Sequence, residues 1–398
     1  MYKSSTNQAL LLKSMLQISS GNIPSQMAHS VQIVKMAQAF ANKVESFELV
    51  TSGDVWSIVT RKQFSLQDWY GLHSNFPIRK IPLHLKKDYP FPKDYYGGKK
   101  FYILAALYSL IKSPTLVYTR TPAIVKLLLR MNIPVMWELH EIVKEEVFHE
   151  KILTNNKLVG FVTISPKIAD IAISKGLPSE KIIIETSAVD LQKFLPYKSK
   201  ELARQEISLP QNVSTVVYTG HLYDYKGIPT ILEAAKLMPE CRFLLVGGWQ
   251  NDVDRIREIC SHRQLNNVFL TGHVPQSQLA VYLYAADVLI LPTSKQWRLS
   301  EVTSPLKLFD YMASQRPIVA SALPNIETVV QDGHNVLLAE PDNSLSFKAA
   351  IEQLLKETTL SKSIAEQAFQ DVQKYTWEKR AERILKFAQI RLSAMSKS

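Results

Sequence analysis

Cysteine is scarce in this chain of 398 residues, which contains only Cys241 and Cys260. Without metal-like spacing, two cysteines give neither a disulfide framework nor a cysteine metal site, and both are expected to be ordinary core or surface residues. The sequence also lacks a P-loop and a G-x-G-x-x-G fingerprint. We recognise no D-x-D-type pair of the kind that a metal-dependent transferase uses to hold a divalent ion. These absences argue against a P-loop nucleotide hydrolase and a nicotinamide-dependent enzyme. We expect no metal and no bound cofactor.

Long apolar segments are also missing. The longest apolar run, 103–111, lies between Lys100 and Lys112 and is far shorter than the roughly 20 residues that span a bilayer. The apolar stretch 9–16 is interrupted by Lys13, and no small-residue cleavage site follows it, so we expect no secretory signal. The expected location is the cytoplasm.

Length and composition indicate two domains. Hydrophobic residues make up 46% of the chain and charged residues 21%, as in globular proteins, and 398 residues exceed one ordinary core. The best linker is 195–199, which contains Pro196 and a run of Lys and Ser. We therefore expect an N-terminal domain over 1–196, a C-terminal domain over 197–374, and a last helix in 375–398 that crosses back to the first domain.

The positive charge is concentrated in the first half. Residues 1–199 contain 25 Lys and Arg against 15 Asp and Glu, whereas residues 200–398 contain 22 against 21. The segment 79–100 combines seven basic and two acidic residues with four aromatic rings and three prolines. Such a segment resists regular structure and suits either the headgroup zone of an anionic membrane or a solvated, Pro-rich loop. Because no recognised nucleic-acid module accompanies the charge, nucleic acid is not an expected partner.

Apolar strands alternate with amphipathic helices, which predicts α/β domains with parallel sheets covered on both faces. In the first half we expect strands at 15–19, 47–51, 115–119, 134–138, 160–164 and 182–185, and helices at 25–42, 101–112, 122–131, 142–154 and 166–175. In the second half we expect strands at 215–218, 242–246, 268–270, 288–291 and 318–321, and helices at 228–237, 252–262, 276–285, 305–314, 325–330, 345–357 and 377–393. Two doubly wound, Rossmann-like domains facing each other would share a central cleft at the carboxyl ends of their strands.

The segment 304–313 indicates an anion site. Ser304 is a preferred N-cap, Pro305 suits the first helical position, and Lys307 adds a cation in the first turn. Upstream, one apolar strand ends at Gly220, followed by Lys226, and another ends at Gly247. From the residues alone, this pattern predicts a two-domain α/β enzyme that binds a phosphate-rich ligand. On the same evidence, the favoured interpretation of Lys226 is a solvated lysine beside a turn glycine.

Several motifs follow one another in a characteristic order after residue 215. They are Tyr218-Thr219-Gly220, Lys226-Gly227, Leu245-Val246-Gly247, Thr271-Gly272-His273-Val274, Ala285-Ala286-Asp287, Ser304-Pro305-Leu306-Lys307-Leu308-Phe309-Asp310, Pro317-Ile318-Val319 and Asp332-Gly333. On these motifs the chain resembles retaining glycosyltransferases of family 4 (glycosyl transferases group 1), which have the GT-B fold. The first half resembles the family more weakly, through Tyr118-Thr119-Arg120, Leu139-His140-Glu141 and Ile164-Ser165-Pro166.

The resemblance implies roles around a nucleoside diphosphate. Lys226 matches the lysine that neutralises the leaving diphosphate as the glycosidic bond breaks. The family's arginine five positions earlier is replaced by His221, so either His221 donates a neutral hydrogen bond or Lys307 or Arg298 supplies the cation. Asp310 matches the carboxylate that accepts from the ribose hydroxyls. The implied nucleotide-binding set is Gly220, His221, Lys226, Gly247, His273, Val274, Thr303, Ser304, Pro305, Leu306, Lys307 and Asp310, with His273 and Val274 at the base and the amides of 303–306 at the second phosphate.

The chain departs from the family at its paired acidic residues. An E-x7-E motif would place the first glutamate at Val302, eight residues before Asp310, whereas Glu301 lies one position earlier. A bulged loop would bring Glu301 to the donor sugar, and Glu301 is therefore the candidate carboxylate. No protein nucleophile is assigned.

In the first half, the resemblance implies residues for the sugar and the acceptor. His140 matches the histidine that reaches the donor sugar, with a partly buried histidine at a strand end as the alternative. Arg120 is a candidate for an acidic acceptor or a surface salt bridge. Glu138 and Glu141 flank His140 and are candidates for the acceptor or for solvent. Gly21 and Asn22 lie where the family has a Gly-rich loop against sugar and acceptor, although only one glycine is present.

The resemblance implies a retaining transferase that moves a sugar from a UDP- or GDP-sugar to a saccharide or lipid-linked acceptor, as in relatives that build surface polysaccharides and glycolipids. Front-face displacement, in which the leaving phosphate takes the acceptor proton, fits residues His140, Lys226 and Glu301. Two alternatives stay open: a sugar-nucleotide epimerase or hydrolase, and a catalytically silent binding or scaffold protein. The basic first half leaves room for peripheral attachment to the inner face of a membrane.

Overall fold

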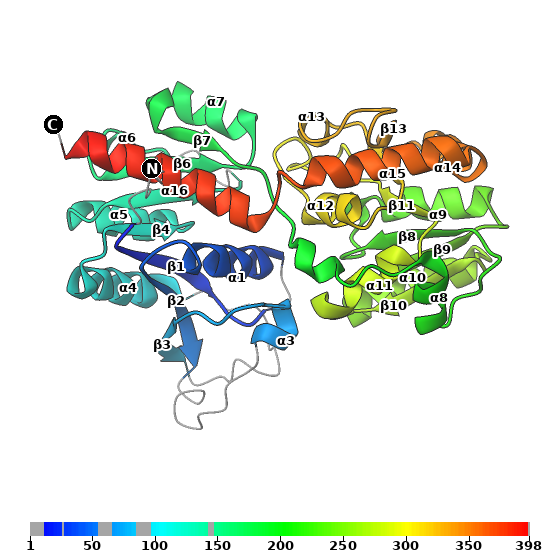
Figure 1. Ribbon diagram of the computed structural model, residues 1–398, viewed down its shortest axis with the longest axis horizontal. Coiled ribbons are helices and arrows are strands. Elements are labelled where there is room, and N and C mark those ends of the chain that lie inside the picture. Colours follow the sequence, from blue (N-terminus) through cyan, green and yellow to red (C-terminus); the bar gives the residue numbers. More distant parts are fainter. Residues whose placement is uncertain (1–11, 26–27, 55–65, 85–96, 142–146, 397–398) are drawn as a thin grey trace, which may run out of the picture. The chain divides into compact units, whose positions relative to one another are not determined.

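The computed structural model describes residues 12–25, 28–54, 66–84, 97–141 and 147–396, which form two compact units (Figure 1). Unit 1 contains the chain up to Thr186 together with the segment from Trp377 onward, and unit 2 contains Ser187–Thr376. The division lies before the predicted boundary at 196 because Val189 and Phe194 are buried in the core of unit 2. The predicted linker 195–199 is thus part of unit 2.

Unit 1 is built on a seven-stranded parallel sheet in the order β3-β2-β1-β4-β5-β6-β7. The strands are β1 (Ser14–Asn22), β2 (Ser46–Asp54), β3 (Ile78–His84), β4 (Leu116–Thr119), β5 (Val135–Leu139), β6 (Leu158–Thr163) and β7 (Ile182–Ile184). Every side chain of β4, β5 and β6 is buried, as expected for strands covered on both faces. The strand order changes direction between β1 and β4, which is where open α/β sheets bind ligands.

Helices pack in pairs on this sheet. The helix α1 (Ala28–Ala41) packs against α16 (Trp377–Met395), and α4 (Gly98–Lys112) packs against α5 (Pro122–Arg130). The last helix of the chain, drawn in red in Figure 1, therefore joins the unit that contains the first strands. The remaining helical segments of unit 1 are α3 (Leu66–Tyr70), α6 (Glu150–Leu153), α7 (Pro166–Ser174) and η2 (Ser179–Lys181).

Unit 2 has a six-stranded parallel sheet in the order β10-β9-β8-β11-β12-β13. Its strands are β8 (Thr215–Thr219), β9 (Arg242–Val246), β10 (Val268–Gly272), β11 (Val288–Leu291), β12 (Ile318–Ser321) and β13 (Leu337–Ala339). Neighbouring residues of one strand face opposite cores: Val217 lies in one apolar cluster and Val216 in the other. The helical segments are η3 (Leu191–Phe194), α8 (Lys200–Glu206), η4 (Asp224–Lys226), α9 (Ile228–Leu237), α10 (Gln250–His262), η5 (Gln276–Gln278), α11 (Leu279–Tyr284), α12 (Leu306–Ala313), α13 (Pro324–Glu327), α14 (Ser344–Lys356) and α15 (Thr358–Val372).

The predicted fold class is confirmed as two doubly wound, Rossmann-like units, but some local predictions are wrong. Residues 79–84 form most of edge strand β3 instead of an irregular segment, and Pro82 is tolerated because an edge strand has one unpaired side. The rest of the basic segment, 85–96, lies outside the described residues. The helix predicted at 142–154 is reduced to α6, capped by His149, with 142–146 outside the described residues. Helices α3, α8 and α15 and strand β13 were not predicted.

Candidate functional site

Two glycines bring the backbones together at the carboxyl ends of β8 and β9. Gly220 and Gly247 have φ angles of +126° and +120°, which disfavour other residues. A Cβ atom on Gly247 would lie 2.5 Å from the carbonyl oxygen of Gly220, and one on Gly220 would lie 2.8 Å from Nζ of Lys307. The absence of side chains therefore leaves space for the Lys307 ammonium group at this edge of the sheet.

Lys226 and Lys307 place two ammonium groups on aromatic rings near this edge. Nζ of Lys307 lies 3.8 Å from the ring centroid of Tyr218, and Nζ of Lys226 lies 3.8 Å from that of Trp297. Burial lowers the pKa of Lys226 to about 8, and burial together with the charge of Lys226 holds the pKa of Lys307 well below its usual range. Within the described part of the chain, neither lysine has a hydrogen bond or ion pair. The pair can therefore accept an anion.

His221 stands beside the two lysines in a series of stacked rings. Its ring is stacked on those of Tyr223 and Trp249, with centroid distances of 5.1 and 5.6 Å. Burial and the charges of Lys307 and Lys226 lower the pKa of His221, so the imidazole is neutral at pH 7. Its Nδ1 is buried and has no hydrogen-bond partner among the described residues. Of the two possibilities for His221, the geometry therefore favours a neutral hydrogen-bonding group beside the Lys307 cation.

The N-terminus of α12 begins one residue later than predicted. Pro305 is the N-cap, and the hydroxyl of Ser304 accepts instead from the amide of Ser187 at 2.8 Å. The Ser187 hydroxyl in turn donates to the Ser304 carbonyl at 2.7 Å. The prediction of Ser304 as an N-cap is therefore wrong. The amide of Thr303 donates to the carbonyl of Leu299, so it is not a free donor as predicted, and the free first-turn donors begin at Leu306 and Lys307.

Asp310 has a cationic partner that the sequence did not indicate. Its Oδ2 lies 3.0 Å from Nζ of Lys193, which also donates to Gln276 at 3.2 Å. Lys193 lies in η3, far from α12 in the sequence and next to the predicted linker, so spacing gave no signal for it. A ribose at Asp310 would also lie near the Lys193 ammonium group.

The remaining predicted residues of unit 2 lie in loops. His273 and Val274 follow β10; burial lowers the pKa of His273, and Val274 packs against the core. Glu301 lies in the turn before α12 with an exposed side chain. The assignment of Glu301 as the carboxylate at the donor sugar therefore stays a prediction.

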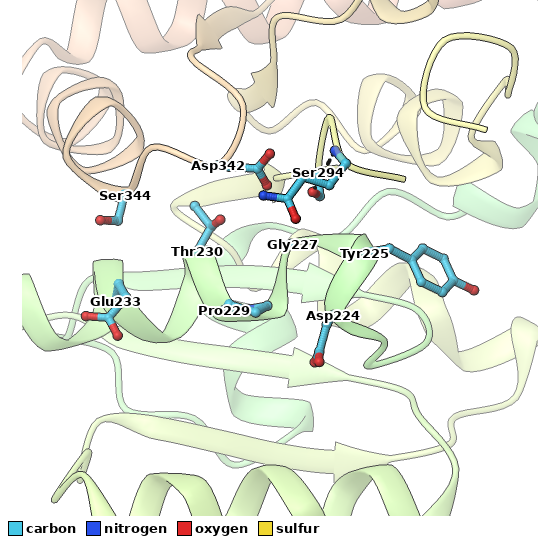
Figure 2. A pocket seen from close by; sticks show the side chains of 10 residues that line it. Asp224, Tyr225, Gly227, Pro229, Thr230, Glu233, Ser294, Asp342 and Ser344 are labelled. Carbon is cyan, nitrogen blue, oxygen red and sulfur yellow. Dashed lines mark hydrogen bonds between the residues drawn. The ribbon is translucent and has the colours of Figure 1, made fainter. Parts of the chain in front are cut away.

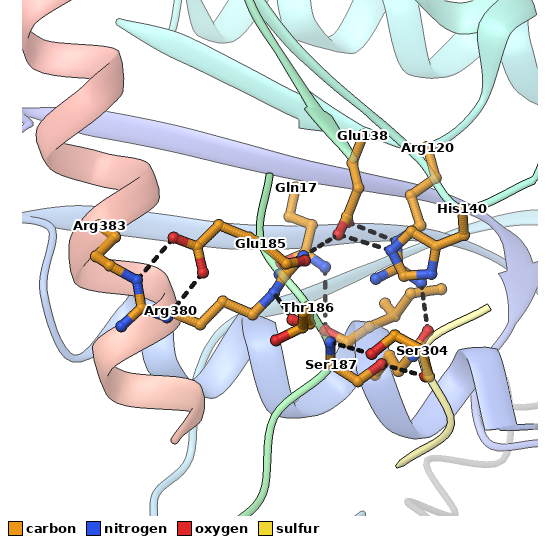
Figure 3. Close-up of polar contacts among 12 residues, drawn as sticks. Gln17, Arg120, Glu138, His140, Glu185, Thr186, Ser187, Ser304, Arg380 and Arg383 are labelled. Carbon is orange, nitrogen blue, oxygen red and sulfur yellow. Dashed lines mark hydrogen bonds and ion pairs between the residues drawn. The ribbon is translucent and has the colours of Figure 1, made fainter. Parts of the chain in front are cut away.

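In unit 1, a fully buried carboxylate organises the residues after β4 and β5. Glu138 forms ion pairs of 2.6 Å with Arg120 and with Arg380 of α16, and accepts from Nε2 of His140 at 2.8 Å (Figure 3). Burial would raise the pKa of Glu138, but the charges of Arg120 and Arg380, with the His140 contact, hold it well below its usual range. Arg120 thus has a buried structural partner and also donates to Gln32 at 2.9 Å.

This environment determines the protonation state and the tautomer of His140. Burial, with the charge of Arg120, lowers the pKa of His140 to about 4. At pH 7 the ring is therefore neutral, and because Glu138 is ionised and can only accept, Nε2 carries the hydrogen and Nδ1 is unprotonated. The alternative reading of His140 as a partly buried histidine at a strand end describes its surroundings correctly, and these surroundings also orient the ring.

A second layer of contacts supports this cluster. Arg380 donates from Nε to the carbonyl of Thr186 at 2.8 Å, and Arg383 forms two hydrogen bonds with Glu185 at 2.7 and 2.8 Å (Figure 3). Sequence reasoning placed Glu138 at the acceptor or in solvent, which is wrong because its side chain is fully buried between two arginines, and it missed Arg380. The available signal was a carboxylate inside an otherwise apolar strand, 134–138, and an arginine in the amphipathic last helix.

The other predicted residues of unit 1 lie near the ends of β1 and β5. The carbonyl of Gly21 accepts from the Thr51 hydroxyl at 2.6 Å, and Asn22 is the last residue of β1. Glu141 follows His140 and has an exposed side chain. The strand ends thus bring Gly21, Asn22, Arg120, His140 and Glu141 to the same edge of the unit 1 sheet.

No group of three or more His, Cys, Asp or Glu side chains in the described residues could hold a metal ion. Asp252 and Asp254 have D-x-D spacing, but they lie on α10, where Asp254 pairs with Arg257 at 2.7 Å. Across the same described ranges, no helix is both long enough and apolar enough to cross a membrane.

Comparisons with known proteins indicate the family. Residues 213–357 match the family model described as glycosyl transferases group 1. The D-inositol 3-phosphate glycosyltransferase of Corynebacterium urealyticum is 24% identical over 250 residues, which are 59% of this chain and 57% of that protein. Over residues 213–357, which are less than half of the chain, this chain is similar to the group 1 glycosyl transferases. Its match spans a little over half the length of such curated relatives.

Solved structures show that this chain has the GT-B fold. Sucrose-phosphate synthase from Thermosynechococcus elongatus has a TM-score of 0.74 and 18% identity, with 96% of this chain and 100% of that chain covered. The Anabaena protein HepE, in complex with UDP-glucose, has a TM-score of 0.69 and 15% identity, with 96% and 99% covered. The fold prediction and the family resemblance are both confirmed.

Proposed function

We propose that this chain is a retaining glycosyltransferase that transfers a sugar from a nucleoside diphosphate donor, a UDP- or GDP-sugar, to a saccharide or lipid-linked acceptor. The observation that carries the proposal is the pair Lys226 and Lys307, two partly buried cations without an anionic partner in the described residues. Together with the first amides of α12, they suit a diphosphate. HepE, in complex with UDP-glucose, supports a uridine donor.

The same groups suit the transition state. Negative charge develops on the leaving diphosphate as the glycosidic bond breaks, and preformed cations in a water-poor site stabilise that charge most effectively. Asp310 would accept from the ribose hydroxyls, and His273 with Val274 would line the base. His140, neutral and held by Glu138, is assigned to the donor sugar by its resemblance to the family histidine. The leaving phosphate itself would take the acceptor proton.

A donor screen tests this function. UDP-, GDP- and ADP-sugars are added to the protein, and protection against thermal unfolding is measured, since a ligand that binds only the native state raises apparent stability. We expect the UDP- or GDP-sugar series to protect and ADP-sugars not to. Products are then analysed with and without saccharide acceptors. Free or epimerised sugar nucleotide without transfer would support the epimerase or hydrolase, and absence of any nucleotide binding would support a silent scaffold.

One surface of unit 1 supports a cytoplasmic enzyme attached peripherally to a membrane, where a lipid-linked acceptor would be presented. Five large apolar side chains are exposed on one face of α4, and Ile111 is 82% exposed. Lys99 and Lys100 begin this helix, Lys112 ends it, and it contains no acidic residue. An apolar face with flanking lysines suits the headgroup zone of an anionic bilayer. The face consists of Ile103, Leu104, Leu107, Leu110 and Ile111.

We expect the protein to co-sediment with vesicles that contain phosphatidylglycerol more than with pure phosphatidylcholine vesicles, and to be released as salt is raised. The double variant Leu107→Gln with Ile111→Gln should bind such vesicles at least about tenfold more weakly, because it lacks two apolar side chains that would be buried in the bilayer. Ile173→Gln, an exposed isoleucine on α7, is the matched control. Equal sedimentation of both variants at low salt would refute attachment through α4.

A further inference from the structure

A cavity of about 520 Å³ lies on α9, and neither Lys226 nor Lys307 is among the residues that line it (Figure 2). It is bounded by η4, the first turns of α9, the loop after β11 and the start of α14. Its volume lies within the roughly 300 to 1,000 Å³ of pockets that bind small molecules. The lining residues are Asp224, Tyr225, Gly227, Pro229, Thr230, Glu233, Ser294, Gln296, Asp342 and Ser344.

Three carboxylates of this cavity each have one oxygen in use. Asp224 accepts from Arg255 through Oδ1 at 3.0 Å, Glu233 pairs with Arg263 through Oε1, and Asp342 accepts from the Lys295 amide through Oδ2 at 3.0 Å. The second oxygen of each has no hydrogen-bond partner in the described ranges. The carboxylates of Asp224 and Glu233 are paired with arginines and point away from Asp342 in Figure 2, so Asp342 supplies the uncompensated carboxylate of the lining.

Neutral polar groups complete the lining. Thr230 is only 6% exposed, its side chain lies at the centre of the cavity lining in Figure 2, and its hydroxyl has no hydrogen-bond partner among the described residues. The hydroxyl is reached by solvent from the cavity, so water or a ligand can form a hydrogen bond with it. Ser344 and the side-chain amide of Gln296 add further donors and acceptors, and Pro229 adds apolar surface.

This chemistry excludes several ligand classes. The acceptor oxygens would repel a phosphate, and the carboxylates are not grouped to hold a metal ion in the part of the chain that the structure describes. We propose that the cavity is a second ligand site on unit 2 that binds a neutral saccharide unit. The hydroxyls of a sugar donate to the free oxygen of Asp342 and exchange hydrogen bonds with Thr230 and Ser344, and its C–H face covers Pro229. This site does not depend on the proposed transfer reaction.

The residues between the cavity and the two lysines are closely packed. Asp224 faces the cavity from η4, while Lys226 at the end of η4 contacts Trp297. Gly227 follows with φ +83°, and a Cβ there would lie 1.7 Å from the Pro292 carbonyl oxygen. The close packing fixes these residues, so a sugar in this cavity does not occupy the space at the two lysines.

The test is ligand-detected NMR on the full chain with D-glucose, D-galactose, N-acetyl-D-glucosamine and maltotriose, each in the presence and absence of UDP. We expect at least one sugar to bind, and UDP not to displace it. Thr230→Val removes only the hydroxyl and should weaken this binding roughly 3- to 10-fold. Ser344→Tyr fills the cavity and should abolish it. Ser363→Ala, an exposed serine on α15, is the matched control.

Unchanged melting temperatures would show that the variants are folded. Displacement of the sugar by UDP, or sugar binding that survives both Thr230→Val and Ser344→Tyr, would overturn the proposal. So would binding of spermidine by the wild type without binding of any of the four sugars, because the cavity would then select cations. If the two sites are separate, the Lys226→Met variant loses UDP binding but still binds the sugar. The transferase proposal can therefore fail while the proposal of a second site stands, and the two failures can be told apart.

Discussion

Replacing Lys226 with methionine is expected to abolish protection by UDP and to raise the melting temperature of the ligand-free protein. Burial lowers the pKa of Lys226 from 10.5 to about 8, so the folded state holds this proton less tightly than the unfolded chain. The resulting loss of stability develops as the pH falls from 10.5 to about 8 and is complete below about 8. Methionine retains the apolar stem and removes the charge. We expect an increase of about 2 to 4 °C, as roughly 1 kcal/mol gives in a domain of this size.

Turnover with the preferred donor should fall by two or more orders of magnitude in the same variant, because a cation that neutralises the leaving diphosphate is lost. The control is Lys236→Met, an exposed lysine at the end of α9. It should change neither stability nor nucleotide protection. A Lys226→Met protein that still gains stability from UDP would remove this lysine from the site.

The wild-type protein offers a second measure of the same lysine. A bound diphosphate raises the pKa of Lys226, so binding takes up a proton once the pH exceeds about 8. Affinity for UDP should therefore be constant below that pH and fall up to tenfold per pH unit above it. Calorimetry at pH 7 and pH 9 in buffers of different ionisation enthalpy checks both the affinity and the proton uptake. Equal affinity at the two pH values would contradict the assignment.

Glu138→Gln is expected to destabilise unit 1 by about 3 to 5 kcal/mol, because Arg120 and Arg380 are left as buried cations without a carboxylate. In the wild type, the folded-state pKa of Glu138 lies well below its ordinary value of 4.5. Its stabilising contribution is therefore complete above that value and is lost as the pH falls further. The variant should lack this acid-sensitive component. Urea denaturation from pH 7 to pH 3 measures both effects.

A matched control separates this cluster from general surface charge. Glu180→Gln changes an exposed glutamate of unit 1 and should cost little. In Glu138→Gln, the His140 ring also loses its charged acceptor, and nitrogen NMR shifts should show a mixture of Nδ1–H and Nε2–H tautomers in place of one. If the Glu138→Gln protein were as stable as the Glu180→Gln protein, Arg120 and Arg380 would have found other partners, and the prediction would be wrong.

Much of the fold could be predicted because strand and helix patterns are local. The predicted helix 228–237 and strands 242–246, 288–291 and 318–321 agree with α9, β9, β11 and β12 residue for residue. The errors arise where tertiary context decides. Residues 79–84 contain a proline and two charged residues, yet pairing with β2 makes them an edge strand. The short strand β13 is formed by pairing with β12, which local sequence does not reveal.

The site was predictable only where a motif places several groups in one segment. Lys226 and the start of α12 could be found in this way. The partners that set their chemistry could not, because they come from distant segments: Lys193 reaches Asp310, Ser187 holds Ser304, and Arg380 reaches Glu138. Such contacts depend on the folded arrangement of each unit and leave no spacing pattern in the chain.

The stacked rings around the lysines also make the site optically visible. Trp249 and Trp297 are the only tryptophans between residues 187 and 376, and one stacks on His221 while the other lies under the Lys226 ammonium group. Indole emission from unit 2 therefore arises entirely beside these two basic side chains. A change in that fluorescence reports the arrival of a nucleotide without any added label.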